Sequence, residues 1–147
     1  MLSLLLATIE VISFNIRYDN PSDGQNSWAN RKHTISSYLA QSRADFIGLQ
    51  EVLPSQLEAI TPNLSDYKVI SRTREAEEHK GESAPILFHQ DRWRIDSTHQ
   101  GTMWLSTHPD KPGSKSWDSS LPRICTWGRF ERRGSGQPNA VWVMNTH

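Results

Sequence analysis

The spacing of apolar residues in the first half of the chain predicts two strands that alternate with two helices. Glu10–Ile16 is rich in β-branched and aromatic residues and stops at a polar cluster with Pro and Gly, which predicts a buried strand followed by a turn. From Asn30, a plausible helix cap, to Ser42 the apolar positions recur at helical spacing. Phe46–Leu49 then predicts a second buried strand, and Pro54 suits the first position of a short second helix.

The second half of the chain follows a different pattern, which is typical of consecutive strands. A strand is expected at Tyr67–Ser71, and the charged, aperiodic stretch Arg72–Glu82 is expected to be a solvated loop. Further strands are expected at Pro85–Phe88, Trp93–Ile95, Gly101–Leu105, Cys125–Phe130 and Val141–Met144. Ser106–Leu121 is too long for a tight turn, and Arg132–Pro138 is expected to be a hairpin loop. This order predicts an α/β or α+β sandwich built from layers.

The two ends of the chain indicate how the domain is bounded. Residues 1–9 form an apolar extension, but the run Leu4–Ala7 lacks a preceding basic residue and is better explained as padding of the first strand than as a signal peptide. No stretch approaches the roughly 20 apolar residues that a membrane helix needs. At the other end, Asn145–His147 follows directly on an apolar strand. We therefore expect residues 10–147 to form a domain that is cut short.

Charge and cysteine content narrow the classes of function. The 147 residues include 16 basic and 16 acidic side chains, so the formal net charge is zero. A neutral protein has no overall field that attracts a polyanion, and any phosphate recognition would have to be local. The single cysteine, Cys125, excludes an intramolecular disulfide and a cysteine-rich zinc site. The compartment stays open, because the lack of disulfides favours the cytosol only weakly and the apolar start is compatible with secretion.

Polar side chains follow two of the expected buried strands at the points where these strands end. Asn15 lies near the end of the first strand, and Glu51 follows Phe46–Leu49. Layered α/β proteins place their sites at such strand ends, and a carboxylate with a nearby amide suits Mg²⁺. Two simpler interpretations compete with this one. Glu51 could cap the helix that begins near Pro54, and Asn15 could start an Asx-turn.

Several other side chains could contact an anionic ligand. His147 ends a third apolar strand and could donate a proton or hydrogen bond to a phosphate oxygen. Arg123 could donate two parallel hydrogen bonds to a phosphate group. For Arg129, an ion pair with Glu131 or another acid is the better expectation. Trp117 could stack a base, a sugar or a lipid headgroup, although anchoring of its loop explains it equally well. Trp28 is also expected in a loop, and the remaining four of the six tryptophans are assigned to the core. The other histidines lack ligand spacing and are expected at the surface: His33, His79, His89, His99 and His108.

Five short motifs, in order and spread over nearly the whole chain, resemble the endonuclease/exonuclease/phosphatase superfamily. They are Ser13–Asn20, Ile47–Val52, Gly81–Ile86, Trp117–Trp127 and Asn145–His147. The resemblance is closest to the small bacterial and fungal hydrolases related to carbon catabolite repressor deadenylases. It implies a DNase I-like, four-layer αββα sandwich and metal-dependent cleavage of a phosphoester bond by water.

The resemblance also implies roles for individual residues. Glu51 matches the metal-binding glutamate, with Mg²⁺ or Mn²⁺ as the metal, and Asn15 matches the asparagine that helps to hold the metal and phosphate. His147 matches the histidine that contacts the scissile phosphate. Arg123, Trp117 and Arg17 are then expected to bind phosphate or the rest of the substrate, a nucleic acid, phospholipid headgroup or sugar phosphate. No obligate protein partner is inferred.

The chain also departs from the family pattern. The later Gly-Asp-x-Asn motif and the C-terminal Asp-His pair have no counterpart, so we expect little or no activity from this chain alone and an uncovered inner face on its first sheet. At the third motif, many relatives have an aromatic residue where Ser83 stands and a basic one where His89 stands. Two alternatives stay open: a tryptophan-rich binding module or pseudoenzyme without catalysis, and, within the same class, a 3′-5′ exoribonuclease of the deadenylase type.

Overall fold

The computed structural model describes residues 8–134 and 140–147. Most of the expected N-terminal extension and of the expected Arg132–Pro138 hairpin loop therefore lies outside the described residues. The strands are β1 (Val11–Asn15), β2 (Phe46–Gln50), β3 (Tyr67–Ile70), β4 (Ile86–His89), β5 (Trp93–Trp104), β6 (Ile124–Arg132) and β7 (Ala140–Thr146). The helices are α1 (Trp28–Ser42) and α2 (Pro54–Ile60), with short 3₁₀ helices η1 (Pro21–Asn26) and η2 (Thr61–Asn63).

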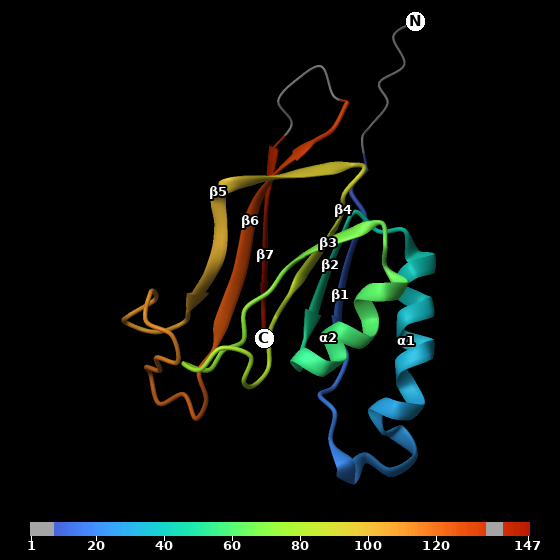
Figure 1. Ribbon diagram of the computed structural model, residues 1–147. Coiled ribbons are helices and arrows are strands. Elements are labelled where there is room, and N and C mark those ends of the chain that lie inside the picture. The colour runs from blue at the N-terminus through green and yellow to red at the C-terminus, as the bar shows by residue number, and fades with distance from the viewer. Residues whose placement is uncertain (1–7, 135–139) are drawn as a thin grey trace, which may run out of the picture.

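The first sheet has four strands in the order β1-β2-β4-β3. β1 and β2 run parallel, and Asn15 is in register with Gln50, whereas the β2–β4 and β3–β4 pairs are antiparallel. Helices α1 and α2 cover one face of this sheet (Figure 1). The core between helices and sheet is formed by side chains such as Leu39, Leu49 and Ile60, each fully buried. Because β1 and β2 are parallel and adjacent, their carboxyl ends meet at one edge of the sheet.

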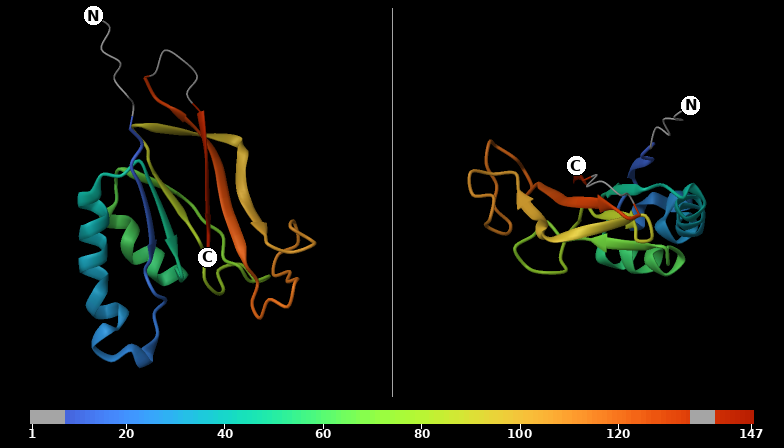
Figure 2. Two further views of the ribbon diagram at one scale, coloured as in Figure 1. Left: turned by 180° about the vertical axis from the view of Figure 1, so that it is seen from behind. Right: turned by 90° about the horizontal axis from the view of Figure 1, so that it is seen from above.

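The second sheet is antiparallel, with the order β5-β6-β7, and lies against the other face of the first sheet (Figures 1 and 2). The core between the sheets includes Phe46 of β2, Trp93 of β5 and Phe130 of β6, and the Phe46 ring centroid lies 4.9 Å from that of each of the other two. The layers thus run helices, sheet, sheet, and in the view from above both helices lie on the side of the first sheet (Figure 2). No helix in the described part of the chain is long and apolar enough to cross a membrane.

The expected mixed α/β sandwich is confirmed, but several expected elements differ in detail. Helix α1 begins two residues before Asn30, and the Asn30 side chain donates to the Gln25 carbonyl rather than capping the helix. The two expected strands Trp93–Ile95 and Gly101–Leu105 are one strand, β5, which changes register against β6 between Ile95 and Gln100. The intervening residues are polar and exposed, so the sequence pattern resembles a loop although the backbone stays extended.

The expectation that the first sheet has an uncovered inner face is wrong for β2 and β4 but holds at β1, where Val11 is 61% exposed. Side chains of the second sheet, including Val141 and Val143 of β7, pack against that face. Residues alternate between the two faces of a strand, so Trp142 and Met144 point the other way and are 53% and 62% exposed. Trp142 is therefore not a core residue, contrary to the sequence-based assignment, whereas Trp28 lies in α1 and is 94% buried rather than in a loop.

The strand that carries the register change also holds a polar network that sequence analysis predicted only in part. The expected ion pair of Arg129 with Glu131 is confirmed at 2.7 Å, and Arg129 also contacts Asp96. His99 lies in β5 with Nδ1 2.9 Å from the Asp96 carboxylate, and His89 lies in β4. Both histidines were expected at the surface; His99 is exposed, and His89 is partly buried. Hydrogen bonds from Thr98, above all, lower the pKa of the Asp96 carboxyl far below its ordinary value.

Close packing between the sheets predicts the effect of a small substitution at Gly48. A Cβ atom at Gly48 would lie 2.9 Å from the side chain of Asn145, which is too close, so Gly48→Ala is expected to cost about 1 to 3 kcal/mol of stability. Gly101→Ala is a matched control, because its Cβ would meet Trp127 at an ordinary distance of 3.6 Å or more. Urea unfolding of both variants measures the difference. Equal midpoints for the two variants would contradict the packing described here.

Candidate active site

Asn15 and Glu51 lie next to each other where β1 and β2 end. Asn15 Nδ2 donates to Glu51 Oε1 over 2.9 Å, and the backbone N–H of Tyr18 donates to Glu51 Oε2 over 3.2 Å. Asn15 also starts the Asx-turn considered from the sequence, since its Oδ1 accepts the N–H of Arg17 at 2.8 Å. The same asparagine therefore shapes the turn after β1 and holds the carboxylate.

His147 reaches this pair from the second sheet. Its Nε2 lies 3.3 Å from Asn15 Nδ2 and 3.8 Å from Glu51 Oε1. An amide nitrogen can only donate, so a hydrogen bond from Asn15 requires Nε2 to accept and places the imidazole proton on Nδ1. The 3.5 Å approach of Arg123 Nη1 to that Nδ1 is then a contact rather than a hydrogen bond. Three strand ends from two sheets thus meet at one point.

A buried asparagine, Asn145, fixes β7 against the first sheet two residues before His147. Its Nδ2 donates to the carbonyl oxygens of Leu49 and Pro85 over 2.7 and 2.8 Å. Its Oδ1 accepts from Gln50 Nε2 over 2.7 Å, and the residue is 94% buried. All three side-chain hydrogen-bonding groups of Asn145 are therefore matched across the sheet interface, which sets the position of His147.

The backbone at Glu51 is also held in an uncommon conformation. Its φ of 59° lies in the left-handed region, which non-glycine residues seldom adopt. The next residue, Val52, exchanges two backbone hydrogen bonds with Ser83, and Ser83 Oγ donates to the Val52 carbonyl over 2.9 Å. Glu51 does not cap α2, contrary to the simpler interpretation. Instead Gln56 Oε1 accepts the N–H of Leu53, the residue before the helix.

The surroundings of Glu51 favour its ionised form. Partial burial, the largest influence, acts to raise the pKa of this carboxyl. The hydrogen bonds from Asn15 and Tyr18, together with the charges of His147 and Arg17, act in the opposite direction and prevail, so the pKa lies below its ordinary value. Glu51 is therefore a carboxylate at neutral pH, as a metal ligand must be.

Arg17 and Arg123 both lie close to Asn15, Glu51 and His147, but in the described part of the chain only Arg17 is paired with a carboxylate. Arg17 makes two hydrogen bonds to Asp23, each 3.1 Å long, and its Nη1 lies 3.9 Å from Glu51 Oε2. Arg123 forms no ion pair with any residue that the structure describes. The guanidinium of Arg123 is thus the one of these two that is available to an added anion.

Trp117 stands apart from these residues. Its side chain is 72% exposed, and both Trp117 and the following Asp118 have left-handed φ angles, 55° and 58°. Its ring contacts no aromatic or guanidinium group in the described part of the chain. The role of Trp117 in substrate binding stays a prediction.

The donor atoms present suit a hard cation that keeps much of its water. Among the described residues, no three or more His, Cys, Asp or Glu side chains are grouped to hold a metal. Glu51 offers one carboxylate, and Asn15 Oδ1 retains a second lone pair beside its bond to the Arg17 N–H. Mg²⁺ typically takes one or two carboxylates and completes its shell with water and substrate phosphate oxygens. The residues present therefore fit Mg²⁺ or Mn²⁺ better than a cation enclosed by protein ligands.

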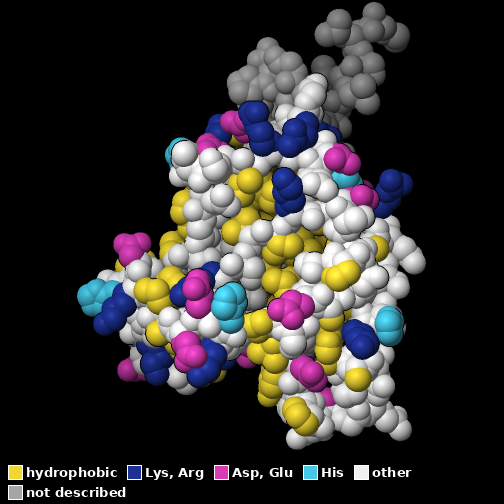
Figure 3. Space-filling model, in the orientation of Figure 1, with side chains coloured by type: hydrophobic (Ala, Val, Ile, Leu, Met, Phe, Trp, Pro, Cys, Tyr) yellow, Lys and Arg dark blue, Asp and Glu magenta, His cyan; other side chains and the backbone are white. Residues whose placement is uncertain are grey.

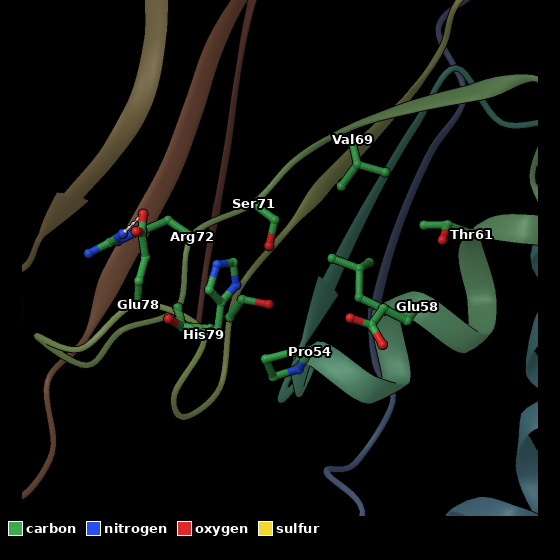
Figure 4. Close-up of a pocket in the computed structure, with 11 residues that line it drawn as sticks. Pro54, Glu58, Thr61, Val69, Ser71, Arg72, Glu78 and His79 are labelled. Atoms are coloured by element: carbon green, nitrogen blue, oxygen red, sulfur yellow. Dashed lines mark hydrogen bonds and ion pairs between the residues drawn. The ribbon is translucent and has the colours of Figure 1, made fainter.

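The site is a small depression in the surface. It encloses only about 10 Å³ and is lined by Glu51, Arg74, Glu82, Ser83, Ala84, Arg123, Ile124 and His147. A larger cavity of about 320 Å³ lies between α2 and residues 69–79 (Figure 4). That cavity contains the paired Arg72 and Glu78 but none of the converging strand-end residues. We place the chemistry at the depression, because Glu51, Arg123 and His147, the residues singled out from the sequence, line it.

Sequence analysis missed four residues that build this site. Asn145 and Gln50 interrupt or end apolar strands just as Asn15 does, so the same signal could have singled them out. Arg74 and Glu82 lie in the charged stretch interpreted as a solvated loop, yet they pair at 2.8 Å and line the depression. Nothing in the local sequence marks that pair, because its partners become neighbours only when the loop folds back.

Comparison with known proteins supports the assignment of this arrangement to a family. The chain is similar over 95% of its length to an endonuclease/exonuclease/phosphatase from Bacteroides vulgatus, with 33% identity and a TM-score of 0.88. It is also similar to a mannosyl-6-phosphatase from Bacteroides thetaiotaomicron, with 33% identity over 93% of the chain and a TM-score of 0.82. A protein of unknown function from Enterococcus faecalis matches with 25% identity over 91% of the chain and a TM-score of 0.80.

The chain spans about half the length of these relatives, covering 52%, 51% and 51% of the three. None of the curated proteins compared with the chain matched it. The model of the Endonuclease/Exonuclease/phosphatase family matches residues 12–142, which include both helices and every strand except the first residue of β1 and the last four of β7. The chain therefore belongs to the endonuclease/exonuclease/phosphatase family.

Proposed function

We propose that this chain contributes part of the active site of a divalent-metal-dependent phosphoesterase, which hydrolyses a phosphodiester or phosphomonoester. The observation that carries the proposal is the meeting of Asn15, Glu51 and His147 at the ends of three strands. Glu51, with help from Asn15, would hold Mg²⁺ or Mn²⁺. Membership of the family supports a phosphate ester as the substrate.

Each residue has a distinct task in this proposal. The bound metal would polarise a phosphoryl oxygen and stabilise the leaving oxygen. Arg123, which has no ion-pair partner in the described structure, would bind a non-bridging phosphate oxygen. His147 would donate a hydrogen bond to the scissile phosphate. Arg17, oriented by Asp23, and the exposed Trp117 would contact the rest of the substrate.

Charge distribution bears on the choice of substrate. On the face shown in Figure 3, acidic, basic and histidine side chains are intermixed over the lower half, and no single sign dominates there. A long nucleic-acid footprint depends on many basic contacts, so a small phosphate ester is favoured over extended DNA or RNA, including a deadenylase substrate. The mannosyl-6-phosphatase among the relatives makes a sugar phosphate a reasonable first substrate to test.

Activity is expected to depend on residues beyond those of this chain. We expect the 147-residue protein to show little Mg²⁺-dependent hydrolysis of an aryl phosphate ester. A version extended at its C-terminus by the family's Gly-Asp-x-Asn and Asp-His motifs is expected to be active, because those motifs supply the water-orienting and general-base groups that the resemblance implies. A colorimetric assay with and without chelator compares the two. Strong turnover by the short chain would contradict the half-site proposal.

A binding module without catalysis makes the opposite prediction. The exposed Trp117 and Trp142 would then dominate ligand binding, and binding would be insensitive both to chelator and to Glu51→Ala. Hydrolysis by the extended version that is lost on chelation would exclude this alternative.

A further inference from the structure

A second guanidinium besides that of Arg123 lies in the depression, that of Arg74. Arg74 lies in the loop between β3 and β4, and it lines the same depression as Glu51, Arg123 and His147. A solvated loop was expected here, yet the Arg74 side chain is only 11% exposed. Long cationic side chains are seldom buried so far unless they are paired.

The loop holds Arg74 in a fixed position. Its Nη1 donates to Glu82 Oε2 over 2.8 Å, and its Nε lies 3.5 Å from Glu75 Oε1. Its backbone N–H donates to the Glu82 carbonyl over 2.9 Å, and its own carbonyl accepts the Trp104 indole N–H at 2.6 Å. These contacts also explain part of the Gly81–Ile86 motif. Gly81, with φ of 75°, leaves room for the Glu75 side chain, which a Cβ there would meet at 2.6 Å.

Arg74 nevertheless keeps unused donors. A guanidinium has five N–H groups. Nη1 donates one side-chain hydrogen bond, to Glu82, and Nε is buried against Glu75, so it is not open to a ligand. Nη2 has no hydrogen-bond partner among the described residues and is the donor left for one. Glu82 therefore orients Arg74 without saturating it, and the remaining donors belong to a residue that lines the depression.

Arg74 and Arg123 together give the depression two guanidinium groups. Two carboxylates, Glu51 and Glu82, line it as well, so the charges of the four side chains cancel. A divalent cation at Glu51 would leave an excess of two positive charges. A phosphate monoester carries nearly two negative charges near neutral pH, because its second pKa is about 6, whereas a diester carries one.

We propose that Arg74 is a specificity-determining residue that, with Arg123, binds a terminal phosphate group and makes the site select phosphate monoesters over diesters. The substrate class so named rests on the proposed function of the site. The inference that a phosphate group binds here is argued from the depression and its two guanidinium groups. Phosphate binding can be measured without turnover.

The test is a ³¹P NMR titration of the 147-residue protein with Mg²⁺ present, using inorganic phosphate, phenyl phosphate and diphenyl phosphate. Arg74→Met is expected to weaken binding of inorganic phosphate and phenyl phosphate by about tenfold or more, since two charge-assisted hydrogen bonds are lost. Binding of diphenyl phosphate is expected to change by less than about threefold. Arg74→Lys keeps the positive charge but not the planar guanidinium that can donate two parallel hydrogen bonds, so it should cause an intermediate loss of affinity for the monoester.

Glu82 provides the matched control. Glu82→Gln removes the paired carboxylate but leaves Arg74 in place, so monoester binding should be kept or strengthened. Arg74→Met alone leaves the partly buried Glu82 carboxylate without its partner, and circular dichroism shows whether that variant still folds. If it does not, phosphate binding is measured instead on the double variant Arg74→Met, Glu82→Gln, which removes both members of the pair. Equal losses for monoester and diester, or equal losses in Arg74→Met and Glu82→Gln, would overturn the proposal.

Failure of the wider proposal has a different signature. If the C-terminally extended protein hydrolysed no phosphate ester while phosphate binding still depended on Arg74, the hydrolytic function would be refuted and the phosphate site retained. If hydrolysis occurred but Arg74→Met bound phenyl phosphate as the unsubstituted protein does, the Arg74 inference would fall and the hydrolytic function would stand.

Discussion

Replacing Asn145 with alanine is expected to lower the free energy of unfolding by about 3 to 5 kcal/mol, among the largest effects of any single substitution here. The change would remove three buried hydrogen bonds, those to the Leu49 and Pro85 carbonyl groups and that from the Gln50 amide. The Pro85 carbonyl would keep only the Leu49 N–H, and the Gln50 amide would keep only two longer bonds, to Ser13 and Gly48. A buried polar group that loses its partner costs far more than the net value of an ordinary hydrogen bond. Urea unfolding followed by tryptophan fluorescence measures the loss.

Two further variants make this expectation specific. Asn145→Asp keeps the acceptor for Gln50 but places an oxygen opposite the two carbonyl groups, so it should destabilise the protein about as much as alanine does. Asn63→Ala removes an amide that donates one 3.4 Å bond at the surface, and it should cost less than about 0.5 kcal/mol. An Asn145→Ala protein as stable as Asn63→Ala would show that the two sheets are not held together as described.

The second large effect is expected at Glu51. Glu51→Gln keeps the shape of the side chain and one carbonyl oxygen but removes the only carboxylate among the three converging residues. We expect affinity for Mg²⁺ or Mn²⁺ to fall by about 100-fold or more, because loss even of a supporting group around a metal commonly costs about 10- to 100-fold. Activity of the C-terminally extended protein should fall in parallel. Unchanged metal-dependent turnover in that variant would show that the cation binds elsewhere.

The strand ends could be predicted because their signal is local. An apolar, β-branched run that stops at a polar residue marks both the end of a buried strand and the side chain placed there, as at Asn15 and Glu51. The parallel pairing of β1 and β2 then brings the two together without further information. The resemblance to the family added expected roles for these residues and for His147, which spacing alone left open.

The errors have a common physical cause, which is that long-range contacts override local pattern. The polar residues between Ile95 and Gln100 remain in β5 because β6 pairs on either side of them. Trp142 is exposed because its strand is anchored three residues further on by Asn145, and this fixes which alternate side chains face inward. Arg74 is buried because Glu82, eight residues away, folds back to pair with it.

Whether Glu51 holds a divalent cation can be measured on this chain itself. Electron paramagnetic resonance measures free Mn²⁺ during titration of the unsubstituted protein, Glu51→Gln and Glu58→Gln, a control that removes an exposed carboxylate on α2. We expect one Mn²⁺ site that Mg²⁺ competes for, unchanged in the Glu58 variant and lost in the Glu51 variant. Equal Mn²⁺ affinity in all three proteins would contradict this expectation.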